Sequence, residues 1–215
     1  MTVRAGVLAL QGSSEPHLER LRELGLEPRE VRRRADLEGL THLILPGGES
    51  TTIRRLLDLF GLCDELLARF RRGELSLYGT CAGAILLGRE DGSRPARFGL
   101  LDAEVARNAY GRQVDSFARD VQLDLATDGN DPGRPFHCIF IRAPRFARIG
   151  PGVRVLGAID GEPILLEAPG ILAGTFHPEL TRDLRVHRHF LGLAPAARPA
   201  AASRRDLRSG ALPAT

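Results

Sequence analysis

The chain has 215 residues, of which 43% are hydrophobic and 27% charged, and its formal net charge is +3. These values are typical of a soluble globular protein, and this length is enough to bury a sizeable core in one domain. No stretch approaches the roughly 18 consecutive apolar residues of a membrane span. The N-terminal run MTVRAGVLALQG is typical of a buried strand rather than a signal peptide, so we expect a cytoplasmic protein that binds no membrane.

The positive charge is concentrated in the C-terminal tail. From Pro195 onward the chain carries four arginines and one aspartate, which account for the whole net charge of +3. The rest of the chain is therefore close to neutral, which argues against a nucleic-acid-binding face. The tail is rich in Ala, Pro and Arg, and we expect residues 194–215 to be disordered beyond a domain at 1–193.

The first half of the chain alternates short apolar runs with helical patterns. Strands alternating with helices of this length predict βαβ units and a parallel sheet covered on both faces. Strands are predicted at 5–10, 27–31, 41–46 and 75–79, and helices at 16–24, 50–60, 63–70 and 82–88, the third continuing the second after Gly61.

The second half is mostly strand-like, with Gly, Pro or Asp between apolar runs. Asp160-Gly161 separates two such runs and predicts a hairpin. Strands are predicted at 98–107, 119–127, 136–144, 153–160, 162–168 and 170–176, followed by a helix within 182–193. Together the two halves predict an α/β fold: a three-layer domain whose central sheet is mostly parallel, with additional antiparallel strands from the second half.

Three loops follow predicted strands and are expected at one edge of this sheet: Gln11-Gly12, 46–50 and 79–83. Sites in open α/β sheets form at the carboxyl ends of the strands. The third loop, GTCAG, is the thiol form of the G-x-S-x-G elbow, in which a sharp strand-to-helix turn exposes a nucleophile. The glycines leave room for the turn, the helix N-terminus favours the thiolate of Cys81, and the N–H of Ala82 faces a forming oxyanion.

The sequence offers structural alternatives for each of these groups. An arbitrary cysteine is more often a buried core thiol, and that interpretation suits Cys63 and Cys138. Three cysteines without a CxxC spacing indicate neither a disulfide framework nor a zinc site.

His177 is the strongest candidate for the base that a cysteine nucleophile needs. It follows a predicted strand and begins HPEL, so the carboxylate of Glu179 can return to the imidazole and hold its tautomer. Glu179 could equally be a solvated turn residue. His187 and His189 stand two apart on a predicted helix and face different directions, which excludes a two-histidine metal site.

The loop LPGGES exposes backbone N–H groups at a strand end and could supply a second oxyanion donor. It also resembles a tight turn into a helix with Ser50 or Thr51 as N-cap, and both roles are compatible.

Taken together, these motifs resemble the triad (class I) glutamine amidotransferases, and more narrowly the glutaminase subunits of pyridoxal 5'-phosphate synthases. GTCAG and HPE are shared across the class, whereas PGGESTT, GRQVDSF and FIRAP are specific to this subunit. The resemblance spans nearly all of residues 5–191 and is carried by GVLALQG, LILPGGESTTI, YGTCAGAILL, RNAYGRQVDSF, FIRAP and TFHPELTRDLRVHRHFL.

The resemblance implies a glutaminase that works through a glutamyl thioester. In it Cys81 attacks the side-chain amide of L-glutamine, His177 gives a proton to the leaving ammonia, and Glu179 orients His177. Gly48 and Ala82 form the oxyanion hole. Substrate contacts fall on Gly48, Glu49, Ser50, Arg107, Ile141 and Arg142. A guanidinium can bind an α-carboxylate bidentately, although most arginines form surface ion pairs instead.

The resemblance also implies a partner. Ammonia passes through a tunnel to a (β/α)8-barrel synthase subunit that builds pyridoxal 5'-phosphate, in an assembly of twelve copies of each subunit, and docking activates the glutaminase. The chain itself needs no cofactor or metal. The segment QGSSEPHL departs from the family pattern at Ser14 and Pro16, close to Gln11, which the family places near the oxyanion hole and the partner.

Two other functions remain open on the sequence. One is a triad glutaminase for another synthase, or a related cysteine hydrolase, against which GRQVDSF and FIRAP argue. The other is a scaffold or regulatory subunit without activity, against which the intact Cys81, His177 and Glu179 argue.

Overall fold

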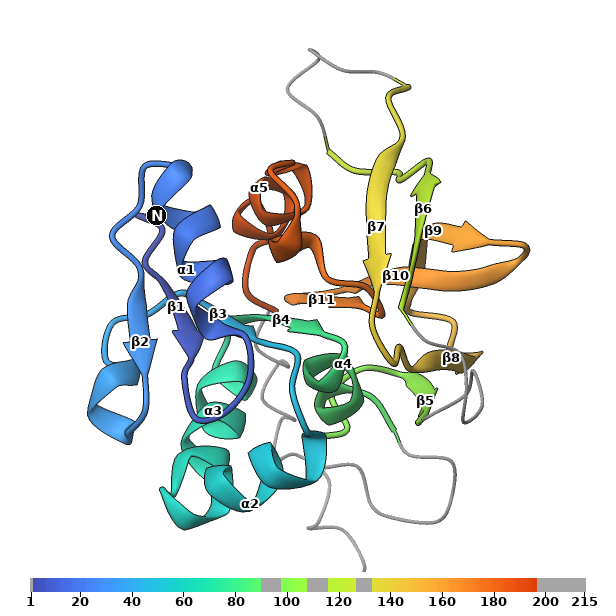
Figure 1. The fold of residues 1–215 in the computed structure, drawn as a ribbon. Helices are drawn as coiled ribbons and strands as arrows, with labels where there is room; N and C mark the ends of the chain where they lie inside the picture. Colours follow the sequence, from blue (N-terminus) through green and yellow to red (C-terminus); the bar gives the residue numbers. More distant parts are fainter. Residues whose placement is uncertain (1, 90–97, 108–115, 127–132, 197–215) are drawn as a thin grey trace, which may run out of the picture.

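The computed structural model describes residues 2–89, 98–107, 116–126 and 133–196 (Figure 1). Most of the stretch RNAYGRQVDSF and the tail beyond residue 196 lie outside the described residues. The central sheet has seven strands in the order β2-β1-β3-β4-β11-β10-β9. These strands are β1 (Ala5–Leu8), β2 (Arg29–Val31), β3 (His42–Leu45), β4 (Ser76–Thr80), β9 (Arg154–Ile159), β10 (Glu162–Ala168) and β11 (Ile171–Gly174).

The sheet is parallel from β2 to β11 and antiparallel from β11 to β9. The predicted hairpin joins β9 to β10, and Asp160 and Gly161 both have positive φ angles, 49° and 83°. Positive φ at both central residues is what a tight hairpin turn requires. Two further antiparallel pairs are formed by β5 (Ala103–Ala106) with β8 (Arg145–Ile149) and by β6 (Phe117–Val121) with β7 (Phe136–Phe140).

Helices cover both faces of the sheet, as the alternation of strand side chains requires. On one face, Leu43, Leu77 and Ala173 pack in a core with residues of three helices. On the other face, the neighbouring strand residues Ile44, Tyr78 and Leu172 pack with residues of two helices. The first face carries α2 (Ser50–Leu59), α3 (Leu62–Arg71) and α4 (Ala82–Leu87), and the second carries α1 (Ser14–Glu23) and α5 (Arg185–Leu191). Figure 1 shows the two groups on opposite sides of the sheet, so the predicted three-layer architecture is confirmed.

Several predicted boundaries were wrong. The second and third helices are separate, because Gly61 adopts a left-handed conformation with φ 63° that ends one helix and starts the next. The first helix starts at Ser14 rather than Pro16. Strand β8 and two short 3₁₀ turns, η1 (Arg34–Leu37) and η2 (Pro178–Leu180), were not predicted. Among the described residues, no helix is long and apolar enough to cross a membrane.

Candidate active site

The loops after four neighbouring strands meet at the carboxyl edge of the sheet. Gln11-Gly12 follows β1, the loop 46–49 follows β3, Cys81 follows β4 and His177 follows β11. The first two loops are tied by a hydrogen bond from the Ser13 N–H to the Gly47 carbonyl at 3.2 Å. The convergence of the three predicted loops is therefore observed, and β11 adds a fourth.

Cys81 occupies a sharp turn between β4 and α4. Its backbone has φ 49° and ψ −102°, a conformation that residues with a side chain rarely adopt, and its N–H donates to the Gly174 carbonyl at 2.8 Å. The glycines on either side make the turn possible. A Cβ on Gly79 would lie 2.5 Å from the Gly83 carbonyl carbon, and one on Gly83 only 2.0 Å from the Leu45 carbonyl oxygen. The glycines thus allow the close helix–strand packing that the sequence predicted.

His177 and Glu179 form a buried hydrogen-bonded pair next to this turn. Nδ1 of His177 lies 2.7 Å from Oε1 of Glu179, and the two residues are 6% and 2% exposed. Burial alone would lower the pKa of His177, but its interactions with Cys81 and Glu179 outweigh that effect and raise the pKa to about 10. Burial alone would raise the pKa of Glu179, but the imidazoles of His17 and His177 outweigh it and lower the pKa. At neutral pH the pair is therefore an imidazolium held by a carboxylate.

The thiol and the imidazole lie close together without an aligned hydrogen bond. The Cys81 sulfur, in its thiolate form, is near enough to raise the pKa of His177, yet Nε2 of His177 is buried and has no hydrogen-bonding partner among the described residues. The sulfur instead contacts the Ile141 carbonyl oxygen at 3.9 Å. Catalytic hydrogen bonds are often long or misaligned in a free enzyme and tighten only with substrate bound.

The loop between β3 and α2 is held by Gln11 and Glu49. Oε1 of Gln11 accepts from the Glu49 N–H at 2.8 Å. The Glu49 carboxylate caps α2, accepting from the N–H groups of Thr51 at 3.1 Å and Thr52 at 2.6 Å. The predicted N-cap at Ser50 or Thr51 was therefore wrong by one or two residues. Hydrogen bonds from the hydroxyl and N–H of Thr52 and the N–H of Thr51 lower the pKa of Glu49 to about 2, so this carboxylate stays ionised.

A cavity of about 440 Å³ lies over Cys81 and gathers every predicted substrate-binding residue. Arg107 reaches it from beyond β5 and donates from Nη1 to the Thr51 hydroxyl at 3.2 Å. Glu179 does not line the cavity but lies behind His177. The lining residues are Ser13, Gly47, Gly48, Glu49, Ser50, Cys81, Ala82, Ile85, Arg107, Ile141, Arg142, Pro144, His177 and Leu180. Five lining residues were not predicted: Ser13, Gly47, Ile85, Pro144 and Leu180. Gly47 could have been predicted, because it belongs to the loop 46–50 that the sequence analysis identified.

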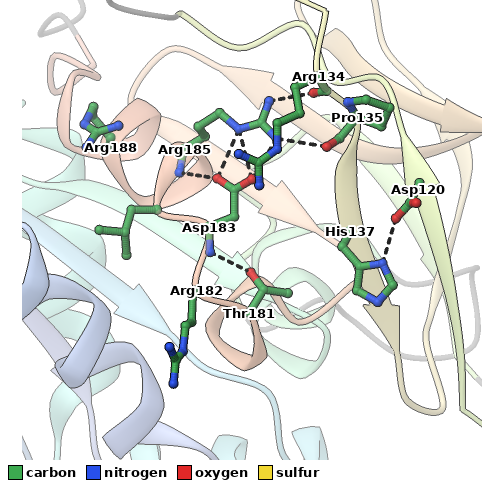
Figure 2. A pocket seen from close by; sticks show the side chains of 10 residues that line it. Asp120, Arg134, Pro135, His137, Thr181, Arg182, Asp183, Arg185 and Arg188 are labelled. Carbon is green, nitrogen blue, oxygen red and sulfur yellow. Dashed lines mark hydrogen bonds and ion pairs between the residues drawn. The ribbon is translucent and has the colours of Figure 1, made fainter. Parts of the chain in front are cut away.

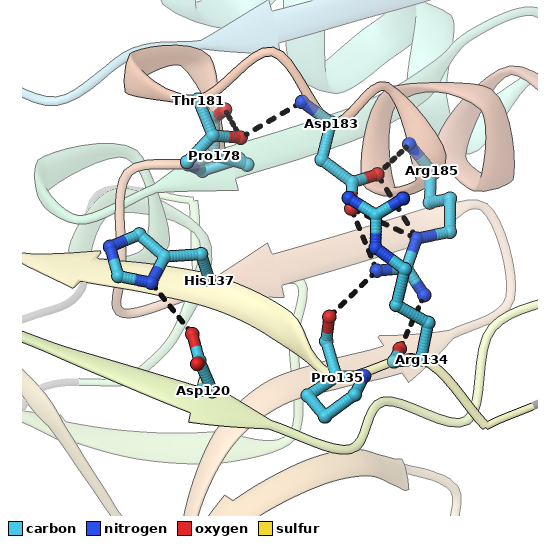
Figure 3. A network of polar contacts seen from close by, with 8 residues as sticks. All are labelled: Asp120, Arg134, Pro135, His137, Pro178, Thr181, Asp183 and Arg185. Atoms are coloured by element: carbon cyan, nitrogen blue, oxygen red, sulfur yellow. Dashed lines mark hydrogen bonds and ion pairs between the residues drawn. The ribbon is translucent and has the colours of Figure 1, made fainter.

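The segment after Glu179 is fixed by a polar network (Figure 3). The Thr181 hydroxyl donates to the Pro178 carbonyl at 3.0 Å and accepts from the Asp183 N–H at 3.3 Å. Asp183 then binds Arg185 through both carboxylate oxygens, at 2.7 to 3.0 Å. Arg185 also donates to the carbonyls of residues 134 and 135 at 2.7 and 3.0 Å, which joins this turn to the start of β7. The network therefore holds the turn that carries Glu179.

A second, larger cavity of about 700 Å³ lies beside this network (Figure 2), and its lining includes none of Cys81, His177 and Glu179. It carries four arginines, but they do not converge on one point. Arg185 is neutralised by Asp183, and Figure 2 shows Arg182 and Arg188 directed away from that pair. The arginines of the larger cavity therefore do not form an anion-binding site, and the smaller cavity over Cys81 is the candidate active site.

The remaining thiols and most other imidazoles have structural partners. Cys63 and Cys138 are 2% and 0% exposed, which confirms their assignment to the core. His42 contacts the Leu193 carbonyl at 3.0 Å, and His189 lies 2.6 Å from a Glu167 oxygen. His17 and His187 are fully buried and contact each other behind Glu179, an arrangement that the sequence analysis did not predict. The available signal was a histidine on the apolar face of α1, next to Leu18.

The chain is similar to glutamine amidotransferases of known sequence and structure. It is 51% identical over 191 residues to the pyridoxal 5'-phosphate synthase subunit PdxT of Thermus thermophilus, covering 88% of this chain and 96% of that protein. It is 52% identical over 200 residues to PdxT of Deinococcus radiodurans, covering 90% and 97%. A crystal structure of a glutamine amidotransferase matches with a TM-score of 0.80 and 49% identity over 87% of this chain and 96% of that one. The structure of PurLQS from Thermotoga maritima, at 18% identity and a TM-score of 0.66, shares the fold.

A family model matches residues 7–194, a range that includes every residue lining the smaller cavity and also Glu179 behind it. The chain belongs to the SNO glutamine amidotransferase family.

Proposed function

We propose that this chain hydrolyses L-glutamine to L-glutamate and ammonia as the glutaminase subunit of a pyridoxal 5'-phosphate synthase. The observation that carries the proposal is that Cys81 and His177 line one cavity, with Glu179 hydrogen-bonded to His177 behind it. Identity of 51% and 52% to two proteins named as PdxT subunits supports the pathway assignment.

In the proposed reaction the Cys81 thiol has given its proton to His177, and the resulting thiolate attacks the side-chain amide carbon of glutamine. The N–H groups of Gly48 and Ala82 bind the oxyanion, and the elbow geometry supports the Ala82 role because the first N–H groups of a helix have no acceptor within the helix. The carbon–nitrogen bond breaks, and the leaving nitrogen takes a proton from His177 to depart as ammonia. Water then gives a proton to His177 and attacks the thioester, which releases glutamate and restores the thiolate–imidazolium pair. Glu179 holds Nδ1 of His177 throughout, at the observed 2.7 Å.

We assign glutamine binding to Gly48, Glu49, Ser50, Arg107, Ile141 and Arg142, all of which line the cavity. A guanidinium binds the α-carboxylate, and Glu49, ionised at neutral pH, lies where it can attract the α-ammonium group. Because Glu49 also caps α2, its position is fixed before substrate arrives.

The proposed acceptor of the ammonia is a synthase subunit with a (β/α)8-barrel fold, in an assembly with twelve copies of each subunit. We propose that docking of this subunit raises the glutaminase activity. The unaligned Nε2 of His177 supports this part of the proposal, since a small shift of the surrounding loops would complete the contact with the thiol.

The proposed glutaminase domain comprises residues 1–193, and we place the protein in the cytoplasm, where three free thiols stay reduced. Residues 194–215 form the proposed tail; residues 197–215 lie outside the described part of the chain.

Glutamate release, measured with and without the barrel subunit, tests the proposal. We expect weak release by the chain alone and a clear increase in the complex. Equal and substantial activity in both conditions would contradict activation by the partner. Cys81→Ala should abolish release while the complex still forms on a sizing column, and His177→Asn should lower it by several orders of magnitude. Retained activity in Cys81→Ala would refute the assignment of Cys81 as the nucleophile. A loss of activity of only a few-fold in His177→Asn would indicate that another residue is the base.

A further inference from the structure

A chain of buried polar groups continues behind Glu179, on the side away from the cavity. Oε1 of Glu179 is occupied by His177, whereas Oε2 is buried and has no aligned hydrogen bond among the described residues. The nitrogen that faces Oε2 is Nε2 of His17, at 3.4 Å, and both side chains are fully buried. A buried carboxylate is stable only where donors face it, so His17 has a direct electrostatic role at this oxygen.

His17 is itself held by two partners from different elements. Its Nδ1 lies 2.9 Å from Nε2 of His187 on α5, and its Nε2 lies 3.2 Å from the Thr80 hydroxyl at the end of β4. The Tyr78 ring packs edge-on against both imidazoles at 6.3 Å, and all three rings are fully buried. The imidazole of His17 is therefore fixed in place by the sheet and two helices, with water excluded.

The hydrogen-bond pattern selects one tautomer for each imidazole. Nδ1 of His187 is buried without a partner among the described residues, and an unpaired lone pair there costs less than an unpaired N–H. The proton of His187 therefore sits on Nε2 and is donated to Nδ1 of His17. His17 then carries its own proton on Nε2, where it is shared between Thr80 and Glu179.

The charge state agrees with this assignment. Burial lowers the pKa of His17 despite the opposing effect of Glu179, and burial together with the proximity of His17 lowers the pKa of His187 well below its usual value. Both imidazoles are neutral at neutral pH, as two singly protonated tautomers require.

We propose that His17 is a positioning residue, whose Nε2–H holds Oε2 of Glu179 so that Oε1 stays aligned on Nδ1 of His177. His187 fixes the tautomer that makes this possible. The kinetic part of the inference rests on the proposed glutaminase function, whereas the structural part concerns the His177–Glu179 contact alone.

Two polar variants separate this role from simple core packing. The amide nitrogen of a glutamine reaches about as far as ring Nε2 and can donate to both Glu179 and Thr80. The side-chain amide of an asparagine reaches only the place of Nδ1, where its oxygen can accept from His187, and it leaves Glu179 without a donor. His17→Asn should therefore lower kcat of the assembled complex by about 10- to 100-fold, the range for residues that orient a catalytic group, with KM changed less than about twofold. His17→Gln should retain most of the activity.

Proton NMR of the free chain supplies a readout that needs no glutamine. The far-downfield signal of the His177 Nδ1–H, identified by its loss in His177→Asn, should persist in His17→Gln and shift or vanish in His17→Asn. If the glutaminase proposal is wrong, wild type releases no glutamate, yet this signal still decides the role of His17. The inference is overturned if the asparagine variant keeps both kcat and the signal, or if the glutamine variant is the more impaired of the two at equal melting temperature.

Discussion

Gly47 lies between the proposed nucleophile and the proposed base, and Gly47→Ala is the sharpest test of that geometry. A Cβ at this position would lie 2.5 Å from Cε1 and 3.2 Å from Nδ1 of His177, and 3.6 Å from the Cβ of Cys81. The backbone of Gly47 does not have a positive φ angle, so alanine carries no conformational penalty there. The effect of the substitution therefore comes from contact with the imidazole.

The size of the effect follows from these distances. Ordinary contacts begin near 3.4 Å, so the ring must retreat by about 1 Å while Nδ1 is held at 2.7 Å from Glu179. A misplacement of about 1 Å in a catalytic group can cost about 100-fold in rate, which corresponds to roughly 2.7 kcal/mol of lost transition-state stabilisation. We expect kcat for glutamate release in the complex to fall by about this factor.

The matched control is Gly152→Ala, because a Cβ at Gly152 meets nothing within 4 Å. Both variants are assayed for kcat, KM and melting temperature. The reasoning fails if Gly47→Ala keeps more than about a third of the wild-type kcat, since the imidazole would then tolerate the added methyl group. A loss of activity in Gly152→Ala would show that the assay responds to general destabilisation instead.

Three further outcomes concern stability. Gly83→Ala should lower the melting temperature, because the added Cβ would lie 2.0 Å from the backbone oxygen of Leu45. This clash should outweigh the roughly 1 kcal/mol by which alanine is favoured over glycine in a helix. A melting temperature at or above that of Gly152→Ala would refute this prediction. Glu49→Ala should cost about 1 kcal/mol, or roughly 2–4 °C in a thermal melt, by removing the cap of α2, and the wild-type advantage should fade as pH falls from 4.5 toward 2. The pKa of His177 is about 10 in the folded protein and 6.5 in the unfolded chain. The free energy of unfolding, measured in urea, should therefore fall by up to about 2 kcal/mol as the pH rises from 7 to 8.5. His177→Asn should reduce this pH dependence.

The elements that sequence patterns predicted are those set by local chemistry. The elbow at Cys81 was predictable because glycines on both sides of a residue at a strand-to-helix turn indicate that the backbone there is packed too closely for a Cβ. The alternation of strands and helices in the first half of the chain likewise predicted the three layers, since apolar runs of this length must be buried on both faces of a sheet.

What could not be predicted depends on partners distant in sequence. Strand β8 forms because β5, about 40 residues earlier, offers an antiparallel edge. Glu49 caps α2 although serine and threonine are next to it, because Gln11 fixes the backbone of Glu49 from another loop. The role of His17 depends on Glu179, 160 or more positions away, and no pattern within α1 reveals that contact.

The pairing of β4 with β11 has a consequence for how the protein is made. Cys81 follows one of these strands and His177 the other, and the Cys81 N–H is bonded to the carbonyl of Gly174 at the end of β11. The proposed nucleophile is synthesised early and its proposed base almost a hundred residues later, so the two meet only when the last strand inserts between β4 and β10. Pairings of such high sequence separation form late in folding. A nascent or partly folded chain therefore carries the thiol without the imidazole, and by the proposed mechanism it cannot hydrolyse glutamine before the sheet is complete.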